Sequence, residues 1–196
     1  MRVLVVYAHP LADSLAAAVL ATILDRLRRD GHDSDVCDLY AEGFDPVLTA
    51  AERRAYNTPR PDTAAVAGHV ARLRAAEALV LCFPTWWYGM PAILKGWLDR
   101  VWAPGVAFDL PEGGGAIRPA LDNIRKFAVV TSYGAPWWLI KLQLHDPVRR
   151  VLIGGLSRLC ARGVTVRFVA LYNTDAASRA RCARFLRRVE GVFARF

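Results

Sequence analysis

Three large aromatic residues stand together where the chain leaves a strongly apolar run. The triplet Trp-Trp-Tyr at 86–88 follows the segment ALVLCF at 78–83, at a place where an ordinary surface loop carries small polar residues. Such side chains can pack on a planar apolar ring system such as isoalloxazine, while backbone N–H groups of the loop hydrogen-bond its polar edge. The alternative is an aromatic cluster that buries itself in the core or in a subunit interface.

A second segment has features that suit a phosphate group. The sequence AHPLADS at 8–14 precedes a helical pattern, and free backbone N–H groups at a helix start favour an anion. His9 and Ser14 add side-chain donors, although a histidine that satisfies backbone carbonyls and a serine that only caps the helix are equally simple explanations. Neither G-x-G-x-x-G nor G-x-x-x-x-G-K-[ST] occurs, so neither a Rossmann dinucleotide site nor a P-loop is indicated.

A third segment combines hydroxyl groups with a glycine. In TSYGAPWW at 131–138, Gly134 lets the backbone approach a flat ligand closely, and the three residues before it all carry hydroxyls. His145 follows a few residues later and could stabilise a developing charge or relay a proton. A surface histidine in front of Asp146 and Pro147 is an equally ordinary explanation.

Strands and helices must hold these three segments together. Apolar, β-branched runs alternate with helical patterns, which indicates an α/β fold with a doubly wound, five-stranded parallel sheet and helices on both faces. The strands are expected at 2–7, 34–39, 78–83, 126–131 and 165–171, and the helices at 14–31, 62–75, 91–101, 147–160 and 176–195. The three segments then follow the first, third and fourth strands, at the carboxyl edge where such sheets bind ligands.

Length and composition are those of one domain over residues 1–196, with enough apolar residues for a substantial core. The formal charge is +8, but the arginines are spread along the whole chain, so nucleic acid is not the expected partner. A basic surface also suits an anionic dinucleotide. The longest uncharged run, 78–94, contains two prolines and a glycine, and no membrane insertion is expected.

The four cysteines are far apart and form no C-x-x-C pair. We therefore expect reduced structural thiols, no redox pair and no metal site. The opening MRVLVVYAHP lacks the long apolar region and the cleavage site of a signal peptide, which favours a cytoplasmic protein.

The stretch from Phe83 to Trp97, FPTWWYGMPAILKGW, resembles F-P-x-x-W-[YF]-x-x-P-A-I-L-K-G-W, the flavin-binding segment of the NAD(P)H:quinone oxidoreductases. The opening V-x-Y-A-H-P-x-x-x-S and the T-S-Y-G at 131–134 are similar to the same family. The resemblance extends over nearly the entire chain, and it points to the flavodoxin-like group that also includes the modulator of drug activity B.

This resemblance implies a homodimer with bound FAD or FMN at the subunit interface. It also implies ping-pong transfer of a hydride from NAD(P)H to a quinone or a similar small aromatic acceptor. The residues that it places at the flavin are His9, Ser14 and Leu15 near the phosphate, and Pro84, Thr85, Trp86, Trp87, Tyr88, Thr131, Ser132, Tyr133 and Gly134 near the ring.

The resemblance also implies a relay of a tyrosine and a histidine. The histidine falls on His145, whereas the tyrosine falls on Leu139, so that Tyr133, Trp137 or Trp138 would have to replace it. His145 and Tyr133 are therefore the candidate catalytic residues. A flavin-binding regulatory or electron-carrier protein that acts on a partner protein is the alternative function.

Overall fold

A five-stranded parallel sheet organises the fold in a computed structural model that describes residues 1–58, 61–111, 113 and 115–196. The strands are β1 (Arg2–Tyr7), β2 (Asp33–Asp38), β3 (Ala78–Pro84), β6 (Lys126–Ser132) and β7 (Thr165–Leu171), in the spatial order β2-β1-β3-β6-β7. The winding reverses between β1 and β3, because β2 is added on one side of β1 and the later strands on the other. The predicted doubly wound sheet is thus confirmed, and its strand ends lie within one residue of those expected.

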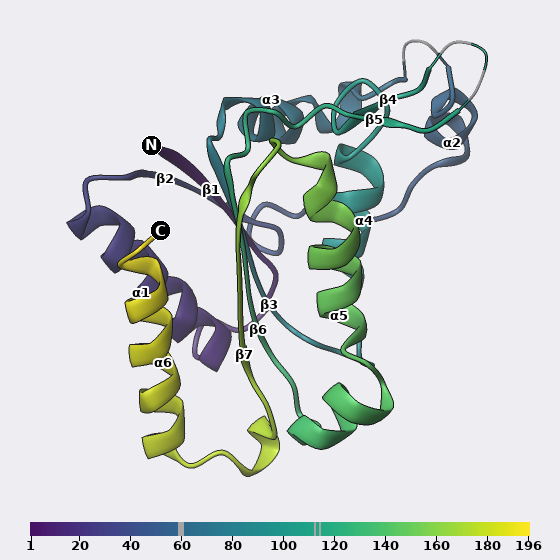
Figure 1. Ribbon diagram of the computed structural model, residues 1–196. Coiled ribbons are helices and arrows are strands. Elements are labelled where there is room, and N and C mark those ends of the chain that lie inside the picture. Colours follow the sequence, from purple (N-terminus) through teal and green to yellow (C-terminus); the bar gives the residue numbers. More distant parts are fainter. Residues whose placement is uncertain (59–60, 112, 114) are drawn as a thin grey trace.

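Both faces of the sheet are covered, which explains why its strands are apolar throughout. Every residue of β1 after Arg2 is buried, and so is every residue of β3 before Pro84. Figure 1 shows α1 (Leu15–Arg29) and α6 (Arg179–Phe193) side by side on one face and α4 (Ala92–Val101) and α5 (Pro147–Arg149) on the other. α3 (Ala67–Ala75) contributes to the same core as α4, after a short helical turn at Ala64–Val66.

The connection from β6 to β7 corrects the expectation of one regular helix at 147–160. α5 is a single turn, and wide π-type turns at Arg150–Gly155 and tight turns at Leu156–Leu159 follow it. Another π-type segment, Leu139–Gln143, was not predicted. The adjacent Gly154 and Gly155 give this stretch little intrinsic preference for a regular α-helix. In the described part of the chain, no helix is both long and apolar enough to span a membrane.

Three small elements outside the sheet were also not predicted. They are α2 (Ala50–Ala55) and the strands β4 (Phe108–Asp109) and β5 (Arg118–Pro119), which form an antiparallel pair. The short α2 is held by a capping box, in which Thr49 Oγ1 accepts from Glu52 N and Glu52 Oε2 accepts from Thr49 N. Glu52 Oε1 also accepts from Nε and Nη2 of the buried Arg100, at 2.9 and 2.6 Å, which fastens α2 to α4.

We expect Glu52→Gln to lower the free energy of unfolding by about 1–2 kcal/mol at pH 7, because buried Arg100 then lacks its carboxylate. Burial raises the pKa of Glu52, but hydrogen bonds from Thr49 and Arg100 outweigh burial and lower that pKa below the usual value. The contribution is therefore complete above the ordinary carboxyl pKa and is lost as pH falls through the lowered one. Urea unfolding at several pH values should show the two proteins converging in acid. A difference that stays constant with pH would contradict this assignment.

Candidate functional site

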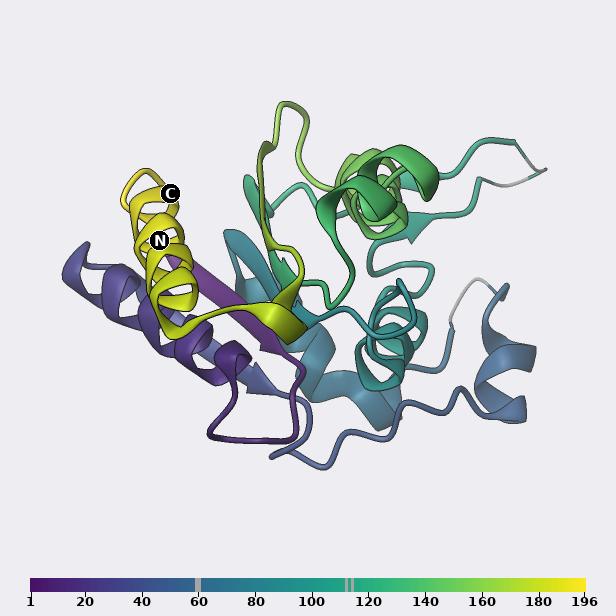
Figure 2. The same ribbon diagram turned by 90° about the horizontal axis from the view of Figure 1, so that it is seen from below.

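The loops after β1, β3 and β6 lie together at the carboxyl edge of the sheet, the side from which Figure 2 views the molecule. Pro84 and Ser132 are partners at the last register position of β3 and β6. Thr85 then donates from both N and Oγ1 to Ser132 O, each at 2.8 Å. The His9 and Trp86 rings, 6.1 Å apart between centroids, bring the first loop beside the second. The sheet therefore gathers the three predicted segments as expected.

The first loop is organised around the start of α1. Ser14 Oγ accepts from Ala17 N at 3.1 Å and donates to Leu11 O at 2.8 Å, which confirms the predicted N-cap. Leu11 N donates to His9 Nδ1 at 3.1 Å, so the histidine braces the same loop. The first N–H groups of a helix have no acceptor inside it and lie at the positive end of its dipole, so this end favours an anionic group.

The aromatic segment after β3 forms a tight two-residue turn. Trp86 N donates to Gly89 O at 3.1 Å and Gly89 N donates to Trp86 O at 3.0 Å. The central residues, Trp87 and Tyr88, have φ of 51° and 60°, a left-handed conformation that normally requires Gly, Asn or Asp. This conformation costs about 1–2 kcal/mol for each residue with a side chain.

Burial against the described residues does not offset that strain at Trp87, which is 96% exposed. Backbone strain of this kind persists where the surrounding structure enforces it, and it is concentrated at functional sites. The turn therefore displays an aromatic surface outward at the expense of stability. Trp86 and Tyr88, each 42% exposed, extend that surface.

A slot of about 210 Å³ lies between this turn and the loop after β6. Its lining residues are Thr85, Trp87, Tyr88, Tyr133, Gly134, Ala135 and Asp175. Gly134 allows the Asp175 carboxylate to lie against the backbone, because a Cβ atom at this position would stand 2.8 Å from Asp175 Oδ2. The aromatic wall thus faces the small residues Gly134 and Ala135 and the Asp175 carboxylate, an arrangement suited to a flat ligand.

Tyr133 lines the slot, but its hydroxyl is directed elsewhere. The hydroxyl donates to Asp146 Oδ1 at 2.8 Å, and the ring stacks on Tyr172 at 5.0 Å between centroids. Burial, reinforced by Asp146, raises the pKa of Tyr133 far above its usual value, so this phenol keeps its proton. The geometry makes Tyr133 a well-anchored part of the wall, and its catalytic role stays a prediction.

His145 lies apart from the slot. It is exposed, has φ of 52°, and lines a separate cavity of about 410 Å³ together with Lys141, Arg149 and Arg150. Within one chain the structure therefore does not bring His145 and the aromatic turn into one cavity. A relay through His145 stays a prediction that requires a ligand or a second subunit to bring the two together.

Asp146 is a site residue that sequence reasoning missed. It is only 5% exposed and accepts hydrogen bonds from the Tyr133 hydroxyl, from Lys141 Nζ and from Arg149 N. These bonds tie the loop after β6 to the start of α5. The available signal was the Asp-Pro pair, because an aspartate in front of a proline is typical of a helix start.

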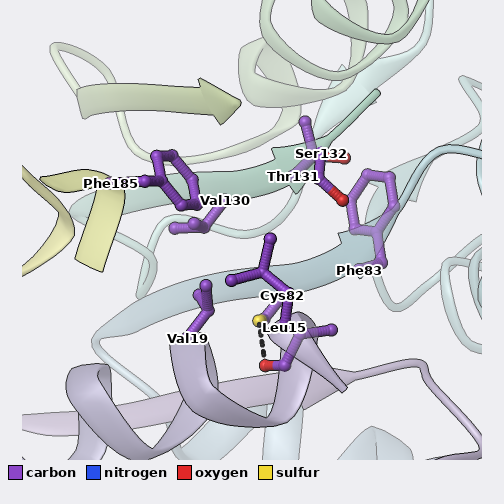
Figure 3. A pocket seen from close by; sticks show the side chains of 9 residues that line it. Leu15, Val19, Cys82, Phe83, Val130, Thr131, Ser132 and Phe185 are labelled. Carbon is purple, nitrogen blue, oxygen red and sulfur yellow. Dashed lines mark hydrogen bonds between the residues drawn. The ribbon is translucent and has the colours of Figure 1, made fainter. Parts of the chain in front are cut away.

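Leu15 and Thr131 face a different space from the slot. Figure 3 shows them at a small cavity between α1 and the ends of β3 and β6, beside Cys82. Its volume of about 10 Å³ has room for about one water molecule. Thr131 Oγ1 is buried there without a hydrogen-bond partner among the described residues. Contacts of Leu15 and Thr131 with a ligand stay predictions.

Comparison with known proteins places these features in a wider group. Residues 1–184 match the model of a family described as having a flavodoxin-like fold. The chain is 36% identical to the uncharacterized NAD(P)H oxidoreductase YcaK of Escherichia coli (strain K12) over 108 residues, 55% of either protein. It is 34% identical to the ribosyldihydronicotinamide dehydrogenase (quinone) of Pongo abelii over 126 residues, 56% of this chain and 54% of that protein. The chain thus spans about half the length of the curated relatives it matches.

A solved structure is similar along the whole chain. The NAD(P)H:quinone oxidoreductase from Methanothermobacter marburgensis is 28% identical, with a TM-score of 0.85, and the match covers 99% of this chain and 98% of that protein.

Proposed function

We propose that this chain, which belongs to the flavodoxin-like family that residues 1–184 match, is a flavin-dependent oxidoreductase. In this proposal a hydride passes from NAD(P)H, through bound FAD or FMN, to a quinone or quinone-like aromatic acceptor. The observation that carries the proposal is the slot between the strained, outward-facing turn at Trp87 and the small residues Gly134 and Ala135. The names of the relatives, an NAD(P)H oxidoreductase and quinone reductases, support the same chemistry.

The residues at the carboxyl edge fit a flavin in three respects. The turn presents aromatic faces, Gly134 and Ala135 form an opposite wall with little side-chain bulk, and the start of α1 favours a phosphate. FAD and FMN both meet these conditions. His9, Ser14 and Leu15 would lie toward the phosphate, while Pro84, Thr85 and Ser132 would form the floor between the two loops.

A bound flavin supplies the hydride-accepting and hydride-donating chemistry, and the side chains of this chain supply position and environment. Trp87 and Tyr88 would orient a flat acceptor and exclude water from it. Backbone N–H groups of the same turn would donate to the polar edge of the ring. Tyr133, which keeps its proton and is anchored by Asp146, would hold the opposite wall in place.

We also propose a homodimer. Several large apolar side chains outside the sheet are between 43% and 62% exposed, and they are Leu110, Ile117, Trp137, Trp138, Leu142 and Val151. Exposed apolar side chains are candidates for an interaction site, and a second subunit would cover those near the aromatic turn together with Trp87. Sedimentation analysis should give twice the chain mass.

A cytoplasmic location is part of the proposal, supported by four cysteines that are all free thiols.

Steady-state kinetics separate this proposal from the alternative of a regulatory or electron-carrier flavoprotein. We expect turnover with NADH or NADPH and a soluble benzoquinone at about 1–10³ s⁻¹, with the parallel double-reciprocal lines of a ping-pong reaction. A flavin-loaded protein that shows no turnover with either nicotinamide would favour the alternative.

Two substitutions at Trp87 should separate backbone strain from ring contact. Trp87→Gly removes the ring and the left-handed strain, and we expect the free energy of unfolding to rise by about 0.5–1 kcal/mol. Trp87→Ala removes only the ring, so stability should change little. If the ring lines the acceptor site, kcat/KM for the quinone should fall about tenfold in both variants. Unchanged kcat/KM in both would remove Trp87 from the site.

A further inference from the structure

A second cluster of ligand-type side chains lies where β2 meets α3, and none of its members lines the flavin slot. Cys37 is in β2, Glu42 is in the turn that follows and His69 is in α3; one ligand atom from each lies within 4.8 Å of the others. Cys37 is buried, and the side chains of His69 and Glu42 are 18% and 33% exposed. The cluster is therefore shielded on the sulfur side and open to solvent on the carboxylate side.

The spacing of the three ligand atoms is that of a tetrahedral metal site. Cys37 Sγ lies 3.4 Å from His69 Nδ1 and 3.8 Å from Glu42 Oε2, and the last two atoms are 4.0 Å apart. Zinc bonds of about 2.3 Å to sulfur and about 2.0–2.2 Å to nitrogen or oxygen give tetrahedral edges of about 3.3–3.6 Å. A contraction of a few tenths of an ångström would complete one face of the tetrahedron.

The three ligands are held in place by contacts that leave these atoms facing one another. Cys37 is part of the β1–β2 ladder, opposite Val6. The His69 ring packs edge-on against Phe44, with centroids 4.9 Å apart. Arg72 Nη1 donates to both Glu42 carboxylate oxygens, at 2.8 and 2.9 Å. Such outer contacts fix the orientation of ligands in established metal sites.

The charges of the neighbourhood also suit a dication. Arg72 is the cation in direct contact with Glu42, and its guanidinium also donates to Asp35, at 2.7 Å from Nη2. Cys37 as thiolate and Glu42 would supply two negative charges to the ion, while Asp35 is shared between Arg72 and Arg2, whose Nη2 lies 3.6 Å from Asp35 Oδ2. Arg100, the other cation that faces His69, is paired with Glu52.

We propose that Cys37, Glu42 and His69 bind a zinc ion with a fourth position open to water or to an exogenous ligand. The mixed sulfur, nitrogen and oxygen set suits Zn²⁺ better than Mg²⁺ or Ca²⁺, which prefer oxygen. The ion would join the turn after β2 to α3, independently of the flavin. The proposal departs from the expectation of no metal site, because ligands at positions 37, 42 and 69 form no recognisable linear spacing.

Equilibrium dialysis of the flavin-loaded full chain against Zn²⁺, after removal of metal with a chelator, tests this proposal. Bound zinc is measured by elemental analysis, and flavin absorbance and circular dichroism report folding. We expect one zinc per chain, and a loss of affinity of at least about 100-fold in Cys37→Ser, His69→Phe and Glu42→Gln, since even outer-shell contacts are worth about 10- to 100-fold. Glu42→Gln keeps the shape of a partly exposed side chain and is the variant least prone to misfold.

Cys182→Ser is the matched control, because it removes a thiol that lies outside the cluster. It should bind zinc as the wild type does. The proposal is overturned if the wild type takes up no stoichiometric zinc, if Glu42→Gln and Cys37→Ser bind it with unchanged affinity, or if Cys182→Ser weakens binding as much as Cys37→Ser.

Discussion

Gly134→Leu is expected to weaken flavin binding by about 10- to 100-fold while the chain still folds. The leucine side chain would enter the slot between Trp87 and Ala135, where the flat ligand is proposed to lie. Overpacking of a fitted site costs about 1–3 kcal/mol, which corresponds to about this factor in affinity. Fluorescence titration of the flavin-free protein with FMN and with FAD measures the change, and circular dichroism shows whether the fold persists.

A double variant separates slot occlusion from a local clash. A Cβ atom at residue 134 would first meet Asp175, the flexible end of a side chain. Gly134→Ala with Asp175→Ala removes that clash and adds only a methyl group, so we expect it to bind flavin nearly as well as the Asp175→Ala single variant. If Gly134→Leu binds flavin as tightly as the wild type, the ring does not occupy this slot.

Gly96→Ala is expected to produce the largest loss of stability, about 3 kcal/mol or more. Gly96 lies in α4, and a Cβ atom there would stand 2.5 Å from Pro46 Cα and closer still to Pro46 O and Cβ. Because these are backbone and ring atoms, they cannot rotate away, and the loop after β2 must move as a whole. Thermal unfolding should show a fall in Tm of several degrees.

Gly191→Ala in α6 provides the opposite case. A Cβ atom at residue 191 would meet nothing within 4 Å, and alanine is favoured over glycine in a helix by about 0.5–1 kcal/mol. We therefore expect a small rise in Tm. Equal effects of the two substitutions would contradict the close packing of α4 on Pro46.

The sheet and the loops at its carboxyl edge could be predicted because their signals are local and strong. Continuous apolar runs fixed β1 and β3 as buried strands, and Ser14 before a periodic apolar face fixed the start of α1. Once parallel strands alternate with helices, the position of the loops follows from the winding of the sheet.

Other features depend on tertiary contacts that leave little trace in the sequence. The short α2 has a local signal in its Thr49–Glu52 capping box, but its attachment depends on Glu52 reaching Arg100 in α4, forty-eight residues along the chain. The left-handed backbone at Trp87 runs against the ordinary preference of tryptophan, so no local rule indicates it. The adjacent glycines at 154 and 155 disfavour a regular helix, a signal that the prediction of one helix at 147–160 did not use. Cys37 and His69 likewise meet only because β2 and α3 do.

Flavin-dependent hydride transfer is the central claim, and anaerobic titration of the flavin-loaded protein tests it most directly. The protein is first saturated with FAD or FMN, then reduced with NADPH or NADH, and then mixed with a benzoquinone. We predict that the visible flavin absorption disappears stoichiometrically with one of the nicotinamides and returns when the quinone is added. A chain that binds neither FAD nor FMN, or a bound flavin that stays oxidised under excess of both nicotinamides, would contradict the claim.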